Sequence, residues 1–97
     1  MADAIVIGAG PNGLVAANRL ADVGLEVLVL EAADEPGGSV KTAELVEPGY
    51  RHDVFSSFYP LGVASPALAA LELDVRWRRA PLVLAHPGAD EIGRAHV

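Results

Sequence analysis

The chain has 97 residues, of which 52% are hydrophobic and 21% charged, so it is long enough for one small core. Its net charge of −6 disfavours nucleic acid as a partner, and the absence of cysteine excludes disulfides, a thiolate nucleophile and cysteine-ligated metals. No basic segment precedes the first apolar stretch, and Gly8 interrupts that stretch. These features argue against a signal peptide or a membrane span and favour a cytoplasmic protein.

Residues 4–30 predict a β-strand, a helix and a second β-strand. Residues 4–7 are wholly apolar, as expected of a parallel strand that is covered on both faces. Residues 11–23 predict a helix with small residues on one face, and Gly24 follows as a stop signal. Residues 27–30 form a second apolar run, so we expect a βαβ unit with a right-handed crossover.

A glycine pattern lies between the first strand and the helix. Residues 5–13 read I-V-I-G-A-G-P-N-G, which gives Gly8, Gly10 and Gly13 the spacing G-x-G-x-x-G of a dinucleotide-binding loop. Gly8 allows a sharp turn out of the strand, and Gly10 leaves room for a pyrophosphate beside the backbone. Gly13 allows the helix to pack closely on the sheet.

The remaining parts of the dinucleotide pattern are a helix N-terminus and an acid. The helix begins near Pro11, where its free N–H groups and the positive end of its dipole can meet phosphates. Glu31 lies eighteen residues after Gly13, at the end of the second strand, where a carboxylate can accept hydrogen bonds from ribose hydroxyls. A tight turn into a closely packed helix would explain two of the glycines, but neither Gly10 nor the acid.

The predicted elements after residue 33 are shorter. Residues 40–46 and 50–54 predict an antiparallel hairpin around a turn at residues 47–49. Ser65 and Pro66 predict the N-cap and the first position of a helix that continues through residue 71. Composition also predicts a loop at residues 34–38, strands at residues 75–78 and 82–86, and a turn at residues 87–90.

The last seven residues, 91–97, read E-I-G-R-A-H-V. The codons GAG ATC GGA AGA GCA CAC GTC encode this peptide and resemble a widely used sequencing-library adapter, in which a stop codon comes next. We therefore expect residues 1–90 to be the N-terminal part of an FAD-binding Rossmann-like domain, for the reasons given next, and residues 91–97 to be a non-native tail.

Residues 31–38, E-A-A-D-E-P-G-G, resemble the extended motif of the FAD-dependent amine oxidase and phytoene desaturase superfamily. In that superfamily a glycine pair closes a loop over the cofactor phosphates, a few residues beyond the ribose-binding acid. An ordinary Pro-Gly-Gly turn is the alternative, but the position after a complete dinucleotide motif favours FAD over NAD. The resemblance implies an α/β fold, in which a Rossmann-like FAD/NAD(P)-binding βαβ unit is followed by a β-hairpin and a short helix.

The resemblance extends into the predicted hairpin. The tracts T-A-E at residues 42–44, P-G-Y at 48–50 and H-D at 52–53 look like the hairpin that leads the chain towards the flavin ring in phytoene-desaturase-like proteins. Residues 53–61 are most similar to the bacterial branch of that group, which also includes the pyridine nucleotide-disulphide oxidoreductase-domain-2 type.

Two positions depart from the pattern of the superfamily. Ser39 stands where members usually carry an arginine directly after the glycine pair. The cation nearest to the glycine pair in the sequence is therefore Lys41. Phe55 and Ser56 stand where amine oxidases have a glycine pair near the flavin. A desaturase-like substrate site is therefore expected rather than an amine-oxidase cage.

The resemblance implies that the full-length protein is an FAD-dependent oxidoreductase acting on a small-molecule substrate. The reaction would be hydride transfer from a C–C or C–N bond to the flavin, and the 97-residue chain alone is expected to be inactive. No catalytic residue is assigned within this chain, and membrane association is left open. The implied cofactor-binding residues are Gly8, Gly10, Pro11, Asn12, Gly13, Glu31, Ala32, Gly38 and Ser39.

Two other functions stay open. One is an NAD-binding Rossmann segment of a dehydrogenase, and the other is a free-standing nucleotide-binding module without catalysis. In each case Glu31 disfavours NADP, because the acid would repel a 2′-phosphate.

Other candidate chemistry is weaker. His52 and Asp53 are neighbours on a predicted strand and point to opposite faces, so they do not predict a general-base pair. The arginines around Trp77 predict a solvated strand edge in a chain of this net charge. No cluster of His, Asp and Glu has metal-ligand spacing.

Overall fold

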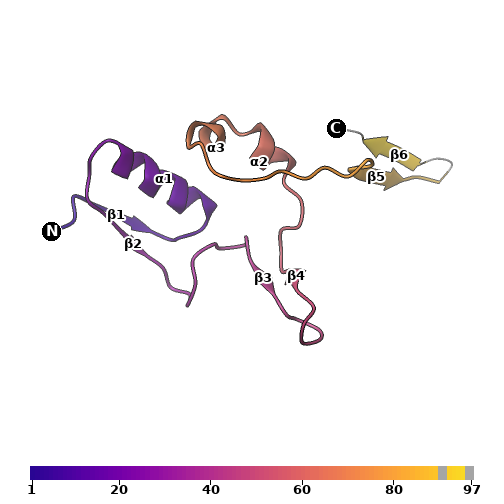
Figure 1. The fold of residues 1–97 in the computed structure, drawn as a ribbon, viewed down its shortest axis with the longest axis horizontal. Helices are drawn as coiled ribbons and strands as arrows, with labels where there is room; N and C mark the ends of the chain where they lie inside the picture. Colours follow the sequence, from indigo (N-terminus) through magenta and orange to yellow (C-terminus); the bar gives the residue numbers. More distant parts are fainter. Residues whose placement is uncertain (90–91, 96–97) are drawn as a thin grey trace.

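The computed structural model describes residues 1–89 and 92–95 (Figure 1). Within these residues the chain forms three two-stranded sheets, one parallel and two antiparallel, with one longer helix and two short ones. The radius of gyration is 17.6 Å, whereas a compact domain of this length has about 13 Å. The accessible surface is 8046 Å², against about 5,300 Å² for a compact protein of this mass. The chain is therefore elongated rather than folded around one core.

The predicted βαβ unit is confirmed. Strand β1 (Ala4–Ile7) pairs in parallel with β2 (Val27–Leu30), with Ala4 opposite Val27 and Ile7 opposite Leu30. Helix α1 (Pro11–Asp22) connects them and packs against both strands (Figure 1). Gly24 has a φ of +93°, which ends the helix and turns the chain into β2.

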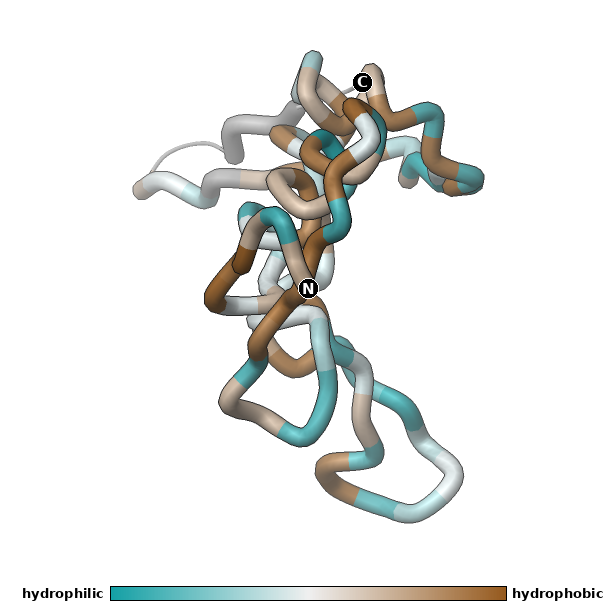
Figure 2. Tube along the Cα trace, turned by 90° about the vertical axis from the view of Figure 1, so that its left-hand side faces the viewer, coloured by the Kyte–Doolittle hydropathy of each residue, from teal (hydrophilic) through white to brown (hydrophobic). Residues whose placement is uncertain are grey.

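Only one face of the β1–β2 sheet is covered within the described residues. Val6 and Val29 lie on the half-buried side, whereas Ile5 and Ile7 on the other side are 60% and 84% exposed. The expectation that the first strand is covered on both faces is therefore wrong for this chain, because none of the described segments packs on the second face. Apolar residues, brown in Figure 2, accordingly occur along the whole trace rather than in one centre.

The predicted hairpin is present but shorter than expected. Strand β3 (Thr42–Ala43) pairs antiparallel with β4 (His52–Asp53), and the connection contains Gly49 at a φ of +90°. The hydroxyl of Thr42 donates to the carboxylate of Asp53 at 3.2 Å. Asp53 is therefore engaged across the hairpin, in agreement with its predicted separation from His52.

Two short helices follow the hairpin. The predicted helix is α3 (Pro66–Ala70), and the hydroxyl of Ser65 accepts a hydrogen bond from the N–H of Leu68 at 3.3 Å, as an N-cap does. Helix α2 (Pro60–Ala64) was not predicted from the sequence, although Pro60 occupies the first-turn position that proline favours.

The strand predicted at residues 75–78 is wrong. The structure forms no strand there, and Trp77 instead lines a hollow of about 230 Å³ beside α2 and α3. The side chains of Val75 and Trp77 lie against the helix pair, and the backbone of this segment pairs with no strand among the described residues. The alternation of apolar residues therefore reflects contact with the helices rather than with a sheet.

The last described elements are β5 (Leu84–Pro87) and β6 (Ile92–Ala95), which form an antiparallel pair. Strand β5 begins two residues later than predicted and includes Pro87, the first residue of the predicted turn. Residues 90–91 and 96–97 lie outside the described residues, and the non-native origin of residues 91–97 stays a prediction.

Candidate functional site

The first glycine loop turns the chain from β1 into α1. Gly8 has a φ of +100°, and its N–H donates to the carbonyl of Leu30 at 2.7 Å, so the loop stays hydrogen-bonded to β2. A Cβ atom at Gly13 would lie 1.9 Å from the carbonyl oxygen of Gly8, and because that oxygen belongs to the backbone, no side-chain movement could relieve the overlap. The close approach predicted for Gly13 is thus explained by its contact with the loop.

The N-terminus of α1 faces out of this loop. Its N-cap is Gly10, its first residue is Pro11, and no side chain caps it. Within the described residues, the N–H groups of Asn12 and Gly13 donate to no backbone carbonyl or side chain. Free N–H groups at the positive end of a helix dipole form a site suited to a phosphate or another anion.

Glu31 lies directly after β2 and points back at the glycine loop. Its Oε2 atom accepts a hydrogen bond from the N–H of Ala9 at 2.6 Å, and its Oε1 atom accepts one from the N–H of Ala33 at 3.2 Å. The bond from Ala9 is the main reason that the pKa of Glu31 is lowered, and the backbone N–H of Ala33 and the positive charge of Lys41 add to the effect. The acid expected to bind ribose is therefore ionised and held against the first glycine loop.

The second glycine loop packs on the first. The N–H of Gly37 donates to the carbonyl of Ala9 at 2.7 Å, and Gly37 has a φ of +123°. A Cβ atom at Gly38 would lie 3.0 Å from the Cα atom of Gly10, so the two loops meet backbone to backbone. The structure thus brings together two glycine motifs that are separated by the whole βαβ unit.

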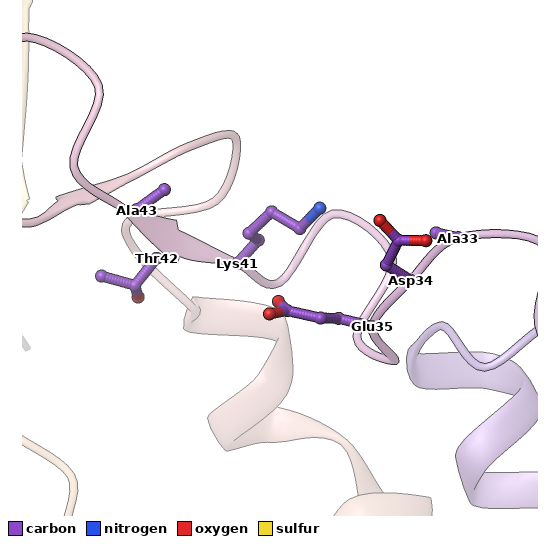
Figure 3. A pocket seen from close by; sticks show the side chains of 6 residues that line it. All are labelled: Ala33, Asp34, Glu35, Lys41, Thr42 and Ala43. Carbon is purple, nitrogen blue, oxygen red and sulfur yellow. The ribbon is translucent and has the colours of Figure 1, made fainter.

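A hollow of about 540 Å³ lies next to this site, between the loop after β2 and strand β3 (Figure 3). Asp34 and Glu35 line it from the loop, and Lys41 and Thr42 line it from the start of the hairpin. Among residues 1–89, the ammonium group of Lys41 forms no ion pair. Lys41 is therefore a half-buried cation beside the glycine loops and lies near the position where the superfamily carries arginine.

The predicted site residues lie in three adjacent segments. The first glycine loop and the start of α1 hold five of them, and the end of β2 holds Glu31 and Ala32. The second glycine loop holds Gly38 and Ser39. Ala32 and Ser39 are both exposed. The residues in the first segment are Gly8, Gly10, Pro11, Asn12 and Gly13.

Sequence analysis did not identify three residues that the structure places in the site: Ala9, Gly37 and Lys41. Ala9 is 3% exposed and bonds with both neighbouring segments, but a variable position inside G-x-G carries no signal for such a role. Gly37 belongs to the glycine pair and was identifiable from it. Lys41 was noted only as the nearest cation.

No group of three or more His, Asp and Glu side chains capable of holding a metal occurs in the part of the chain that the structure describes. None of the helices there has both the length and the apolar character needed to cross a bilayer.

Known proteins contain segments that are similar in sequence to this chain. The family described as NAD(P)-binding Rossmann-like domain matches residues 6–71. Lysine-specific histone demethylase 1 homolog 1 of Arabidopsis thaliana is 56% identical over 41 residues, covering 42% of this chain and 5% of that protein. L-amino-acid oxidase of Daboia russelii is 48% identical over 46 residues, covering 47% and 9%. Prolycopene isomerase 2, chloroplastic, of an Oncidium hybrid cultivar is 42% identical over 81 residues, covering 76% and 14%. The chain thus spans a small part of the length of each of these relatives.

Proposed function

The chain belongs to the NAD(P)-binding Rossmann-like domain family, within the superfamily of FAD-dependent oxidoreductases, and we propose that the dinucleotide it binds is FAD. The observation that carries dinucleotide binding is the 2.6 Å hydrogen bond from the N–H of Ala9 to Glu31, and the choice of FAD rests on the contact between the two glycine loops at Gly10 and Gly38. The hydrogen bond holds the carboxylate proposed to bind ribose against the first glycine loop, which leads into the free N–H groups of α1, so that one dinucleotide could contact both.

Different residues of this chain would bind different parts of the dinucleotide. The N–H groups of Asn12 and Gly13 would receive the pyrophosphate, and Gly10 and Gly38 would allow it to approach the backbone. Glu31 would accept hydrogen bonds from the ribose hydroxyls. When bound, the flavin supplies the hydride-accepting chemistry, and these residues supply binding and orientation.

The wider activity is part of the same proposal. A protein containing this domain would act as an oxidoreductase, transferring hydride from a C–C or C–N bond of a small-molecule substrate. Residues outside this chain would bind that substrate and carry out the catalysis, so the 97-residue chain alone would bind cofactor without turnover.

NAD is the second candidate, because the matching family is described by NAD(P) binding. Two features favour FAD: the contact between the two glycine loops at Gly10 and Gly38, and the similarity to an L-amino-acid oxidase. The carboxylate of Glu31 would repel the 2′-phosphate of NADP, so NADP is the least favoured ligand.

The proposal is tested by titrating the 97-residue chain with FAD, NAD and NADP in a calorimeter. We expect FAD to bind more tightly than NAD and NADP to bind most weakly. NAD binding more tightly than FAD would overturn the assignment of the cofactor, and binding of none of the three would overturn the proposed function.

A matched pair of variants locates the binding site. In Gly10→Ala the new methyl group would have only an ordinary 3.8 Å contact with the Cα atom of Gly38, so the chain should still fold. The methyl group would occupy the space between the glycine loops, and FAD binding should weaken about tenfold or more. The control, Gly62→Ala in helix α2, adds the same atom outside the site, 3.3 Å from the Cβ atom of Tyr59, and should bind FAD like the wild type.

A further inference from the structure

We propose that Glu31 is also a positioning residue, which holds both glycine loops in their cofactor-ready arrangement before any cofactor binds. The inference that the loops are arranged for a cofactor rests on the proposed function. The inference that Glu31 fixes their arrangement does not. Both oxygens of the Glu31 carboxylate accept hydrogen bonds from the backbone, one from Ala9 in the first glycine loop and one from Ala33 in the segment that leads to the second.

The peptide groups on either side of Ala9 transmit this effect. The N–H of Ala9 donates to Glu31, and its carbonyl accepts from the N–H of Gly37 at 2.7 Å. Ala9 is 3% exposed, so its polar groups have little water available as a substitute partner. Three segments, namely the first glycine loop, the end of β2 and the second glycine loop, therefore meet at one residue.

Positioning and ribose binding are chemically compatible. An ionised carboxylate offers about four acceptor sites on its two oxygens, and the backbone uses two of them. The remaining sites are available to hydroxyl groups, so a ribose could bind without displacing Ala9 or Ala33. Glu31 would then hold the loops in both the free and the bound state.

Few charged groups surround the carboxylate of Glu31. The first glycine loop faces it with backbone N–H groups only, and from the segment leading into β3 it is faced by the cation of Lys41. Asp34 and Glu35 follow on its own loop. The hydrogen bonds from the loop, more than any ion pair, therefore fix the carboxylate.

The experiment compares three substitutions of Glu31 in the 97-residue chain without cofactor, by amide hydrogen exchange. Glu31→Gln keeps the side-chain length and one acceptor oxygen, which can still meet Ala9. Glu31→Asp keeps the charge but is shorter by one carbon–carbon bond, about 1.5 Å, and no longer reaches. Glu31→Ala removes both properties, and Glu44→Gln in the exposed hairpin is the control.

Positioning predicts a specific pattern of exchange. In Glu31→Ala and Glu31→Asp the amides of Ala9 and Gly37 should exchange about threefold faster or more, a modest change because the carboxylate itself is exposed. The amide of Leu25, bonded to Leu20 at the far end of the unit, should be unchanged. Glu31→Gln should keep most of the protection at Ala9, and Glu44→Gln should match the wild type.

Three outcomes would overturn the inference: unchanged exchange at Ala9 in Glu31→Ala, a parallel rise at Leu25 that reports general destabilisation, or rescue by Asp rather than Gln. FAD titration of the same variants separates this inference from the proposed function. If the exchange pattern appears but the wild-type chain binds no dinucleotide, the positioning role stands and the cofactor proposal fails.

Discussion

Residues 1–38 and the rest of the described chain are built in different ways. In the first region, hydrogen bonds join segments that are distant in sequence: Gly8 to Leu30, Ala9 to Glu31 and Gly37 to Ala9. In the second region, hydrogen bonds such as those from Val63 to Tyr59 and from Val54 to Lys41 join residues of one helical turn or one hairpin. The glycine loops and the acid, which are also the candidate binding residues, therefore add to the long-range order that the parallel pairing of β1 and β2 provides.

The two regions also differ in how they use apolar residues. In the first region, α1 covers one face of the sheet, so a small shared interior forms around Ala9 and Ala17. Large side chains are exposed in both regions, such as Ile7 at 84% and Leu61 at 83%, but no residue after Gly38 whose burial is described is buried as Ala9 and Ala17 are. Disturbing the first region should therefore affect several segments together, whereas disturbing the second should have local effects.

The largest effect is expected from Gly13→Ala. The new methyl group would overlap the carbonyl oxygen of Gly8, and relief would require α1 to move away from the loop. We expect a loss of about 3 kcal/mol or more in the free energy of unfolding of the first region. Urea titration followed by circular dichroism measures it, with Gly62→Ala as the control expected to stay within about 1 kcal/mol of the wild type. Equal stability of the two variants would mean that the first region is as loosely joined as the second.

A smaller and local effect is expected from Ser65→Ala. This change removes the N-cap of α3 and should cost that helix about 1 kcal/mol. Chemical shifts of residues 66–70 should move towards coil values, whereas those of α1 should not change. Ser57→Ala, at an exposed position outside any element, is the matched control. A change that spreads into α1 would contradict the separation of the two regions.

The smallest effect is the pH dependence of the first region. The pKa of Glu31 is lower in the folded than in the unfolded chain, chiefly because of the N–H of Ala9. Its contribution to stability is therefore complete above the unfolded-state pKa and is lost as the pH falls through the folded-state pKa. The amide proton shift of Ala9 should follow this titration in the wild type and not in Glu31→Gln, while amides of the second region should not follow it. A pKa of Glu31 at or above its usual range would contradict the hydrogen-bonded geometry.

The contrast between the regions also explains what sequence analysis predicted. The βαβ unit was predictable because its signals act locally. Uninterrupted apolar runs favour buried strands, Pro11 favours a helix start and Gly24 a helix end, whatever the distant partners are. Ser65 marked α3 in the same way. The segment at residues 75–78 failed because its apolar residues contact helices, and short apolar runs do not distinguish such contacts from a strand.

The site was predictable to a similar extent. Spacing predicted which residues of the glycine motifs and which acid would be neighbours, because G-x-G-x-x-G followed by an acid prescribes one local geometry. The role of Ala9 was not predictable, since it acts through its backbone and any small residue would look the same in the sequence. The contact between Gly10 and Gly38 depends on how two loops meet, which composition does not specify.

The burial and double hydrogen bonding of Ala9 restrict the genetic changes that the site can accept. A first-base change in an alanine codon can produce proline, which lacks the N–H that bonds to Glu31, or threonine, which adds a β-branched side chain at a position that is 3% exposed. A second-base change can produce valine, aspartate or glutamate, whose larger side chains have no space at a position that is 3% exposed. Glycine and serine remain as the substitutions most compatible with the geometry, so this codon should vary little although Ala9 makes its hydrogen bonds through its backbone alone.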